Sequence, residues 1–98
     1  RKAQGNLPEA LASYQGSVAI AGRLVKSDPG NAGWQRDLSV SLVNVGKTYV
    51  KLNLVVDAKV AFVSAVQILK LLDAAGRLEP RRKPEIAWLE EQIATLSK

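Results

Sequence analysis

The chain has 98 residues and a net charge of +5, and it contains neither cysteine nor histidine. Without these residue types it can form no disulfide or thiolate metal site and lacks the commonest general base and transition-metal ligand, so the sequence predicts no catalytic residue, no metal and no cofactor. The modest positive charge permits an acidic partner or nucleic acid, but it is also typical of an ordinary solvated basic face.

The length corresponds to one small domain or to a piece of a larger protein. The chain starts at Arg1, and nothing near it reads as a signal peptide. We therefore expect a fragment of a longer protein with a cytoplasmic location. The longest uncharged run of its most apolar part, residues 60–69, is far shorter than the roughly 20 residues that span a bilayer. We expect no membrane contact.

The first helical segment is predicted to open at residues 6–9, Asn-Leu-Pro-Glu. Asn6 or a neighbour can cap the helix, Pro8 suits its first turn, and Glu9 favours the positive end of the helix dipole. Residues 1–4 would then be the end of a missing partner helix. Apolar residues follow at steps of three and four, at Leu7, Leu11, Tyr14, Val18, Ala21 and Val25. The turn residues at 27–31 end the segment.

Two further helical segments follow, the second from about residue 32 to residue 52 and the third from about residue 55 to residue 75. The third is the most apolar, and a helix that is apolar on more than one side is usually buried on more than one side. Gly76 suits its C-terminal cap. The second has apolar residues at the helical period, at Trp34, Leu38, Leu42, Val45, Tyr49 and Leu52.

A polar linker with two prolines, residues 77–84, precedes the last segment, residues 84–96. The apolar residues of this segment again lie three or four apart, at Ile86, Leu89, Ile93 and Leu96. No strand-like alternation of apolar and polar residues occurs in the chain. The predicted fold class is therefore all-α, with four antiparallel helices.

The chain matches itself at an offset of 48 residues. The first segment aligns with the third through Ala10 and Ala58, Tyr14 and Phe62, Val18 and Val66, Ile20 and Ile68, and Leu24 and Leu72. The second aligns with the fourth through Asp37 and Glu85, Leu38 and Ile86, Val45 and Ile93, and Gly46 and Ala94. Chance periodicity could match one pair of helices, but one offset that matches two pairs and their acids indicates a repeated helix-turn-helix unit.

These residues resemble the tetratricopeptide repeat family, whose pattern places Leu-Gly, Tyr, Ala and Phe at set spacings. The chain matches that pattern at Leu42, Val45-Gly46, Tyr49, Ala58 and Phe62. The family's usual period is about 34 residues, whereas 48 residues adds roughly two turns to each helix. This is similar to the long-helix variety of kinesin light chains and many bacterial multidomain proteins. The resemblance implies a short right-handed superhelix whose small residues lie where paired helices cross.

The resemblance divides the fragment into repeat units. Residues 5–31 would be the second helix of a partial repeat, residues 32–76 a complete repeat, and residues 77–98 the linker with a C-terminal capping helix. The last helix carries polar residues at two positions that are apolar in the complete repeat, Glu90 and Ser97. Such positions suit the terminal helix of an array.

In the resembled family, first-type helices such as the second segment line a concave surface that binds peptides. On this helix Asn44, Lys47 and Lys51 lie at steps of three and four on one side, near Val40 and Val43. Asn44 falls where some family members hold a peptide's terminal carboxylate, and the lysines could pair with acidic side chains. An ordinary polar helix face is the alternative interpretation, because the flanking residues of such a clamp would lie in other repeats.

The densest charge feature consists of Arg77, Arg81, Arg82 and Lys83. These cations predict an anion contact, or only a solvated linker near the C-terminal end of the third helix, where the helix dipole favours positive charge. No aromatic residue is interleaved with them, so the stacking platform for single-stranded nucleic acid is absent. This disfavours nucleic-acid binding.

The sequence therefore predicts a non-enzymatic interaction scaffold that binds a protein or peptide, and the lysines favour an acidic one. The main alternative is a structural module that packs on its own chain or forms a homodimer. An uncovered face of the first helix would expose apolar surface and promote such self-association. A basic nucleic-acid module is the third and least favoured interpretation.

Overall fold

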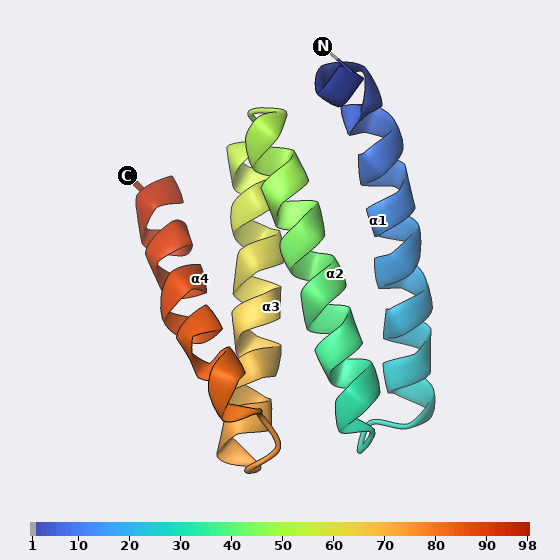
Figure 1. The fold of residues 1–98 in the computed structure, drawn as a ribbon, viewed down its shortest axis with the longest axis vertical. Helices are drawn as coiled ribbons and strands as arrows, with labels where there is room; N and C mark the ends of the chain where they lie inside the picture. Colours follow the sequence, from blue (N-terminus) through green and yellow to red (C-terminus); the bar gives the residue numbers. More distant parts are fainter. Residues whose placement is uncertain (1) are drawn as a thin grey trace.

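A computed structural model describes the backbone of residues 2–98 and the side chains of residues 7–98. No strand lies within residues 2–98. The predicted all-α class with four antiparallel helices is confirmed (Figure 1). The elements are α1 (Lys2–Ser27), α2 (Ala32–Lys51), α3 (Val55–Ala74), the 3-10 turn η1 (Pro80–Arg82) and α4 (Lys83–Leu96).

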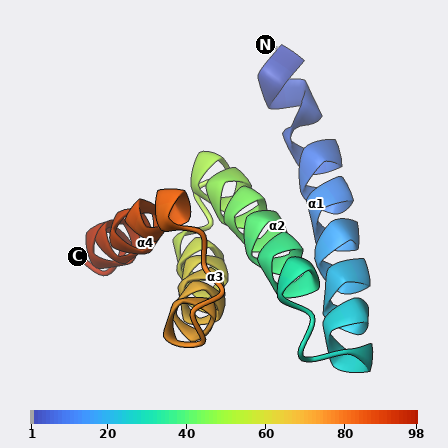
Figure 2. The same cartoon turned by 60° about the horizontal axis from the view of Figure 1, so that its bottom comes forward.

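Each α-helix packs on its neighbour in the chain. α1 packs on α2, α2 on α3 and α3 on α4, whereas over the described residues no Cα atom of α1 lies within 8 Å of α3 or α4. Figure 2 shows the helices as an arc in chain order. Such packing is characteristic of helical repeat arrays, in which each unit contacts only the next one.

Two turns at the same end of the molecule are bonded to each other (Figure 1). Arg77 Nη1 donates to Gly30 O at 3.0 Å, and Arg36 Nη1 lies 3.8 Å from Glu79 Oε1. The turn η1 also stands 48 residues after the first turn of α2, residues 32–34. The offset of 48 residues therefore pairs the end of the α1–α2 connection with the end of the α3–α4 connection, as well as pairing the helices.

The core lies between α2, α3 and α4, and α3 supplies most of it. Its buried apolar residues are Ala58, Phe62, Ala65, Val66, Leu69, Leu72, Leu78 and Leu89. Because α3 packs on both α2 and α4, its sequence is apolar on more than one side. Leu78 comes from the stretch predicted as a polar linker, and its burial attaches that stretch to the core.

The predicted start of the first helix is wrong. α1 begins at Lys2, so residues 2–4 belong to this helix and not to the end of another one, and Pro8 lies inside it. Proline lacks a backbone N–H and forfeits the hydrogen bond to the carbonyl four residues earlier, but a single lost bond does not prevent another turn from preceding it. Arg1 and the side chain of the predicted cap, Asn6, lie outside the described residues.

The predicted cap of the third helix is confirmed. Gly76 adopts a positive φ of 72° directly after the C-cap Ala75, and its N–H donates to Asp73 O at 3.0 Å. The next N–H, from Arg77, donates to Leu72 O at 2.8 Å. Glycine suits this left-handed position because it has no Cβ atom. The cap turns the chain so that Leu78 can enter the core.

Gly46 of α2 lies directly against the ring of Phe62 on α3. A Cβ atom at position 46 would lie 2.6 Å from Phe62 Cε1 and 2.8 Å from Cδ1, closer than side-chain carbons approach. Phe62 is 1% exposed, so its ring has no free space to move into. Ala58, one turn earlier on α3, is also fully buried. The missing side chain of Gly46 therefore allows the close packing of α2 on α3, and Ala58 occupies a position with no room for exposure to solvent.

We predict that Gly46→Ala lowers the free energy of unfolding by about 1 kcal/mol. Overpacking a filled core costs about 1–3 kcal/mol, which outweighs the gain of up to about 1 kcal/mol from the higher helix propensity of alanine. Denaturant unfolding followed by circular dichroism measures the change. Gly16→Ala on α1 is the matched control, because a Cβ atom there meets nothing within 4 Å, and it should stabilise the chain by about 0.5–1 kcal/mol. Equal stabilisation by both substitutions would contradict the prediction.

Candidate functional site: a groove between α2 and α4

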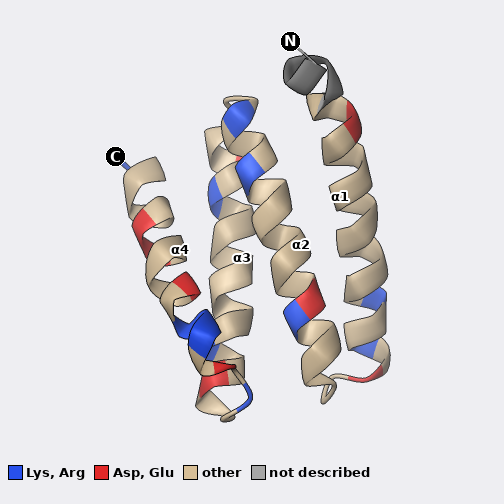
Figure 3. Cartoon of the chain, in the orientation of Figure 1, with Lys and Arg blue, Asp and Glu red and all other residues tan. Residues whose placement is uncertain are grey.

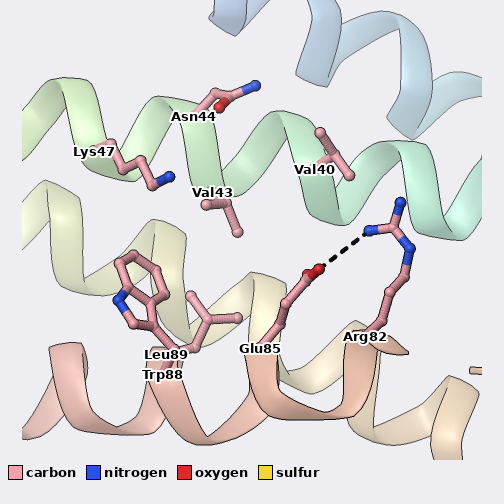
Figure 4. A pocket seen from close by; sticks show the side chains of 8 residues that line it. All are labelled: Val40, Val43, Asn44, Lys47, Arg82, Glu85, Trp88 and Leu89. Atoms are coloured by element: carbon pink, nitrogen blue, oxygen red, sulfur yellow. Dashed lines mark hydrogen bonds and ion pairs between the residues drawn. The ribbon is translucent and has the colours of Figure 1, made fainter. Parts of the chain in front are cut away.

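A groove of about 400 Å³ lies between α2 and α4, with η1 at one end (Figure 4). Four of its residues come from α2, one from η1 and three from α4. They are Val40, Val43, Asn44, Lys47, Arg82, Glu85, Trp88 and Leu89. We call this feature the α2–α4 groove.

Most of the residues predicted to bind a partner line this groove. Val40, Val43, Asn44 and Lys47 do so, whereas Lys51, the last residue of α2, does not. In Figure 4 the side chains of Val43 and Lys47 point toward α4, while the side chain of Asn44 points away from α4. Asn44 therefore lies at the rim of the groove, and the two residues that point inward offer one apolar and one cationic contact.

The sequence did not single out the α4 side of the groove, which is formed by Glu85, Trp88 and Leu89. The repeat offset carried a signal for one of them, because Trp88 stands 48 residues after Val40. A position that faces the groove from one helix should have an equivalent, 48 residues later, that faces it from the matching helix. Trp88 is therefore the repeat equivalent of a residue that was predicted to bind.

Trp88 connects the groove to the core. Its ring packs edge-on against the ring of Phe62, with centroids 5.8 Å apart and an interplanar angle of 84°. Lys47 Nζ lies 5.3 Å from the centroid of the Trp88 ring, within the range of a cation–π contact. Trp88 nevertheless remains 38% exposed. The indole is held in place by the core on one side and is still accessible to a ligand.

The floor of the groove is apolar. Leu89 is fully buried beneath it, Val43 is half-buried, and Val40 is 40% exposed. Together with Trp88 these side chains supply the apolar contacts of the groove, and polar side chains, among them Glu85, supply the rest, a combination that is typical of binding clefts. Lys47 stands over this surface and has no carboxylate within salt-bridge distance among the described side chains.

The η1 end of the groove carries a cluster of charges (Figure 3). Arg82 Nε donates to Glu79 Oε1 at 3.2 Å, and Arg82 Nη1 donates to Glu85 Oε2 at 3.3 Å. Arg81 Nη2 lies 3.5 Å from Glu79 Oε2, and Arg36 Nη1 lies 3.8 Å from Glu79 Oε1. Three guanidinium groups from two elements therefore converge on the carboxylate of Glu79. The sequence did not select Arg36, because it lies 43 residues before Glu79 and only the fold brings them together.

These cations lower the pKa of Glu79. The hydrogen bond from Arg82 lowers this pKa most, followed by the charge of Arg81. Desolvation raises the pKa, and the charge of Arg36 lowers it further. A lowered carboxyl pKa means that the site favours the anionic form of its occupant. The cluster thus has the electrostatics of an anion site that is occupied by a side chain of the same protein.

The four linker cations predicted to contact an anion have different roles. Arg81 and Arg82 belong to the cluster around Glu79, whereas Arg77 donates to the carbonyl of Gly30 and Lys83 Nζ lies 3.4 Å from Asp73 Oδ1. An external anion must therefore compete with an internal partner at every one of these positions. The contact stays a prediction, and only the pair in η1 lies beside the groove.

The described residues offer little to other site chemistries. Within residues 7–98 no three side chains of His, Cys, Asp or Glu gather as metal ligands do. No helix over the described part of the chain is long and apolar enough to cross a membrane. Comparison of the chain with family models, with curated proteins and with solved structures finds no match. The properties of the α2–α4 groove are therefore the basis for a functional proposal.

We predict that the contribution of Glu79 to stability is lost in acid. Because its pKa is lower in the folded chain than the ordinary value of 4.5, Glu79 stabilises the fold fully above pH 4.5, and this stabilisation disappears as the pH falls through the folded pKa. The difference in unfolding free energy between the unmodified chain and Glu79→Gln, measured from pH 7 to pH 3, should therefore shrink below about pH 4.5.

Glu91→Gln is the control for the general effect of removing a carboxylate. Glu91 is exposed on α4 and has no ion-pair partner among the described side chains. A difference for Glu79→Gln that grows in acid would contradict the assignment of the ion pairs around Glu79.

Proposed function

We propose that this chain is part of a non-enzymatic interaction scaffold that binds a peptide, or an extended segment of a partner domain, in the α2–α4 groove. The observation that carries the proposal is Trp88, which is fixed against Phe62 at 5.8 Å and remains 38% exposed. Tryptophan is among the residues that most often dominate interface energies, because it offers a large rigid surface at little cost in conformational entropy.

The groove suits a short segment with one apolar and one acidic side chain. A volume of about 400 Å³ falls in the range of ligand-binding clefts and accommodates one or two side chains over Val40 and Val43. Among the described side chains Lys47 has the face of Trp88 as the one contact of its charged group, so a carboxylate of the ligand gains a charge-assisted contact without breaking an ion pair seen there. An acidic peptide is therefore favoured over a basic one.

The packing supports a tetratricopeptide-like arrangement. The contact between Gly46 and Phe62, the complete burial of Ala58 and the stacking of repeat-equivalent turns agree with the pattern found in the sequence. In a right-handed superhelix of the long-helix variety, α2 and α4 would both be first-type helices, and the α2–α4 groove would lie on the concave face. The proposed setting is a cytoplasmic, multidomain bacterial protein, as the resemblance implies.

We predict that peptides selected from a random library on the unmodified chain are acidic and lose affinity when the groove is altered. Trp88→Ala should weaken binding about 30-fold, which corresponds to a contribution of about 2 kcal/mol. Lys47→Glu should weaken it about tenfold or more through charge repulsion. Isothermal titration calorimetry with a selected peptide measures both effects.

Lys26→Glu makes the same charge change on α1, outside the groove, and serves as the matched control. Its affinity should fall by less than about threefold, as expected for a distant exposed charge. Selected peptides that bind Trp88→Ala as tightly as the unmodified chain would sink the proposal, because their binding site would then lie elsewhere.

Exposed apolar residues on α1 favour a second candidate function, self-association through this helix. Over the described residues α1 packs on α2 alone, and Ile20 and Leu24 are 55% and 38% exposed one turn apart. If they form a dimer contact, light scattering should give a mass that rises with concentration toward twice 10.6 kDa. Ile20→Lys should abolish the rise, whereas Val56→Lys, an equally apolar exposed position on α3, should preserve it. A constant monomer mass at all concentrations would exclude this candidate.

A further inference from the structure

Three arginines converge on one carboxylate at the η1 end of the α2–α4 groove. We call Arg36, Arg81 and Arg82 the arginine cluster; their nearest nitrogen atoms lie 3.8, 3.5 and 3.2 Å from oxygens of Glu79. The side chains of Glu79 and Arg36 are each 42% exposed, so the site is open to solvent. Among the described side chains, Arg82 is the one member of the cluster with a second carboxylate partner, Glu85. Counted together, three cations and two carboxylates leave the cluster with a net positive charge.

The cluster lies at one end of the groove and Lys47 at the other. Arg36 and Lys47 are both on α2, 11 residues apart, which corresponds to about 16 Å along the helix. An extended peptide covers that distance with about five residues at roughly 3.3 Å each. A segment that pairs with Lys47 therefore brings a side chain about five residues away to the arginine cluster, with the apolar floor in between.

We infer that the arginine cluster is a phosphate subsite of the groove, and that Glu79 occupies it until a phosphorylated side chain of the partner peptide displaces it. The inference rests on the proposed function, because it places the phosphate on a peptide that lies in the α2–α4 groove. Glu79 then acts as an internal competitor that keeps the arginines ordered and lowers the affinity for unphosphorylated peptides.

Phosphate is the ligand group that can win this competition. Glu79 is part of the same chain and is always present, so a second monovalent carboxylate gains little by replacing it. A phosphate monoester carries about −1.5 to −2 charges at pH 7 and three strong acceptor oxygens, and guanidinium groups bind such oxygens in pairs of hydrogen bonds. Three arginines around one point match a group with three terminal oxygens better than they match a carboxylate with two.

The geometry favours a phosphorylated peptide over nucleic acid. A nucleic-acid backbone needs a row of cations, whereas this cluster is focused on one point. The neighbouring cations that could extend it, Arg77 and Lys83, are bonded to Gly30 and Asp73. Next to the cluster the groove is lined by the carboxylate of Glu85 and by the apolar side chains of Val40 and Val43, neither of which favours a second phosphate.

The first test uses inorganic phosphate and needs no peptide. Titration followed by NMR of the arginine side-chain N–H groups gives a dissociation constant at fixed ionic strength. Glu79→Gln should tighten phosphate binding about tenfold by removing the competitor, and Arg36→Gln combined with Arg82→Gln should remove the binding. Arg23→Gln, which removes the same charge from an exposed site on α1, is the control and should change the constant by less than twofold. Glu79→Ala repeats the first measurement in case glutamine retains the hydrogen bond from Arg82.

The second test uses a pair of synthetic six-residue peptides, one with phosphoserine at the first position and one with serine, each with two central leucines and a final glutamate. The phosphorylated peptide should bind the unmodified chain about tenfold more tightly or better, and the double arginine variant should lose that preference. Lys47→Glu should weaken both peptides and leave the binding of inorganic phosphate unchanged.

The outcomes separate the inference from the proposed function. If Glu79→Gln and Glu79→Ala both leave phosphate affinity unchanged, or if Arg23→Gln matters as much as the arginine double variant, the subsite is refuted even when peptides still bind the groove. If inorganic phosphate behaves as expected but neither peptide binds, the groove proposal fails and with it the assignment to a peptide. A single-stranded oligonucleotide that binds through the cluster more tightly than the phosphopeptide would overturn the inference in favour of nucleic acid.

Discussion

The contact between Gly46 and Phe62 is the constraint on which the remaining structure depends. Because Gly46 has no Cβ atom, the ring of Phe62 can lie directly against the backbone of α2. The two helices therefore approach closely enough to exclude water from Phe62, which is 1% exposed. Full burial of such a side chain contributes about 1.5–3 kcal/mol, a large share of the stability of a chain this short. The same ring contacts Trp88, so the packing that joins α2 to α3 also sets the position of α4.

Core and groove are therefore two sides of one arrangement. The ring of Phe62 packs nearly perpendicular to the indole of Trp88, and Lys47, one residue after Gly46, reaches across the groove to that indole. An exposed tryptophan on a flexible segment would have to be ordered on binding, which reduces affinity. Here the ordering is already provided by the hydrophobic core. This connection explains why the α2–α4 groove lies directly beside the buried ring of Phe62.

The turn between α3 and α4 has a second, electrostatic, role. Leu78 fixes the turn to the core, Arg77 bonds it to the turn between α1 and α2, and Glu79 pairs with arginines from α2 and η1. Exposed ion pairs of this kind add little stability one by one, so their arrangement matters more for recognition than for folding. These ion pairs lie at one end of the α2–α4 groove, so a partner that extends along the groove reaches the arginines. An anion of that partner could then replace Glu79 as their counter-ion.

The spacing of apolar residues, the turn residues and the offset of 48 residues determined the helical class and most helix boundaries, because helical period and capping are local properties. The residues of α2 expected to bind a partner came from the family resemblance instead, and Lys51 among them does not line the groove. The start of α1 was predicted wrongly, since a proline signals a first turn by preference and not by necessity. Tertiary structure alone decided which side chains far apart in the sequence became partners. Arg36 and Glu79 are 43 positions apart, and Lys47 and Trp88 are 41 apart. Such pairs form only when helices pack at a particular distance, and that distance is set by the shape of buried side chains, which no local pattern encodes.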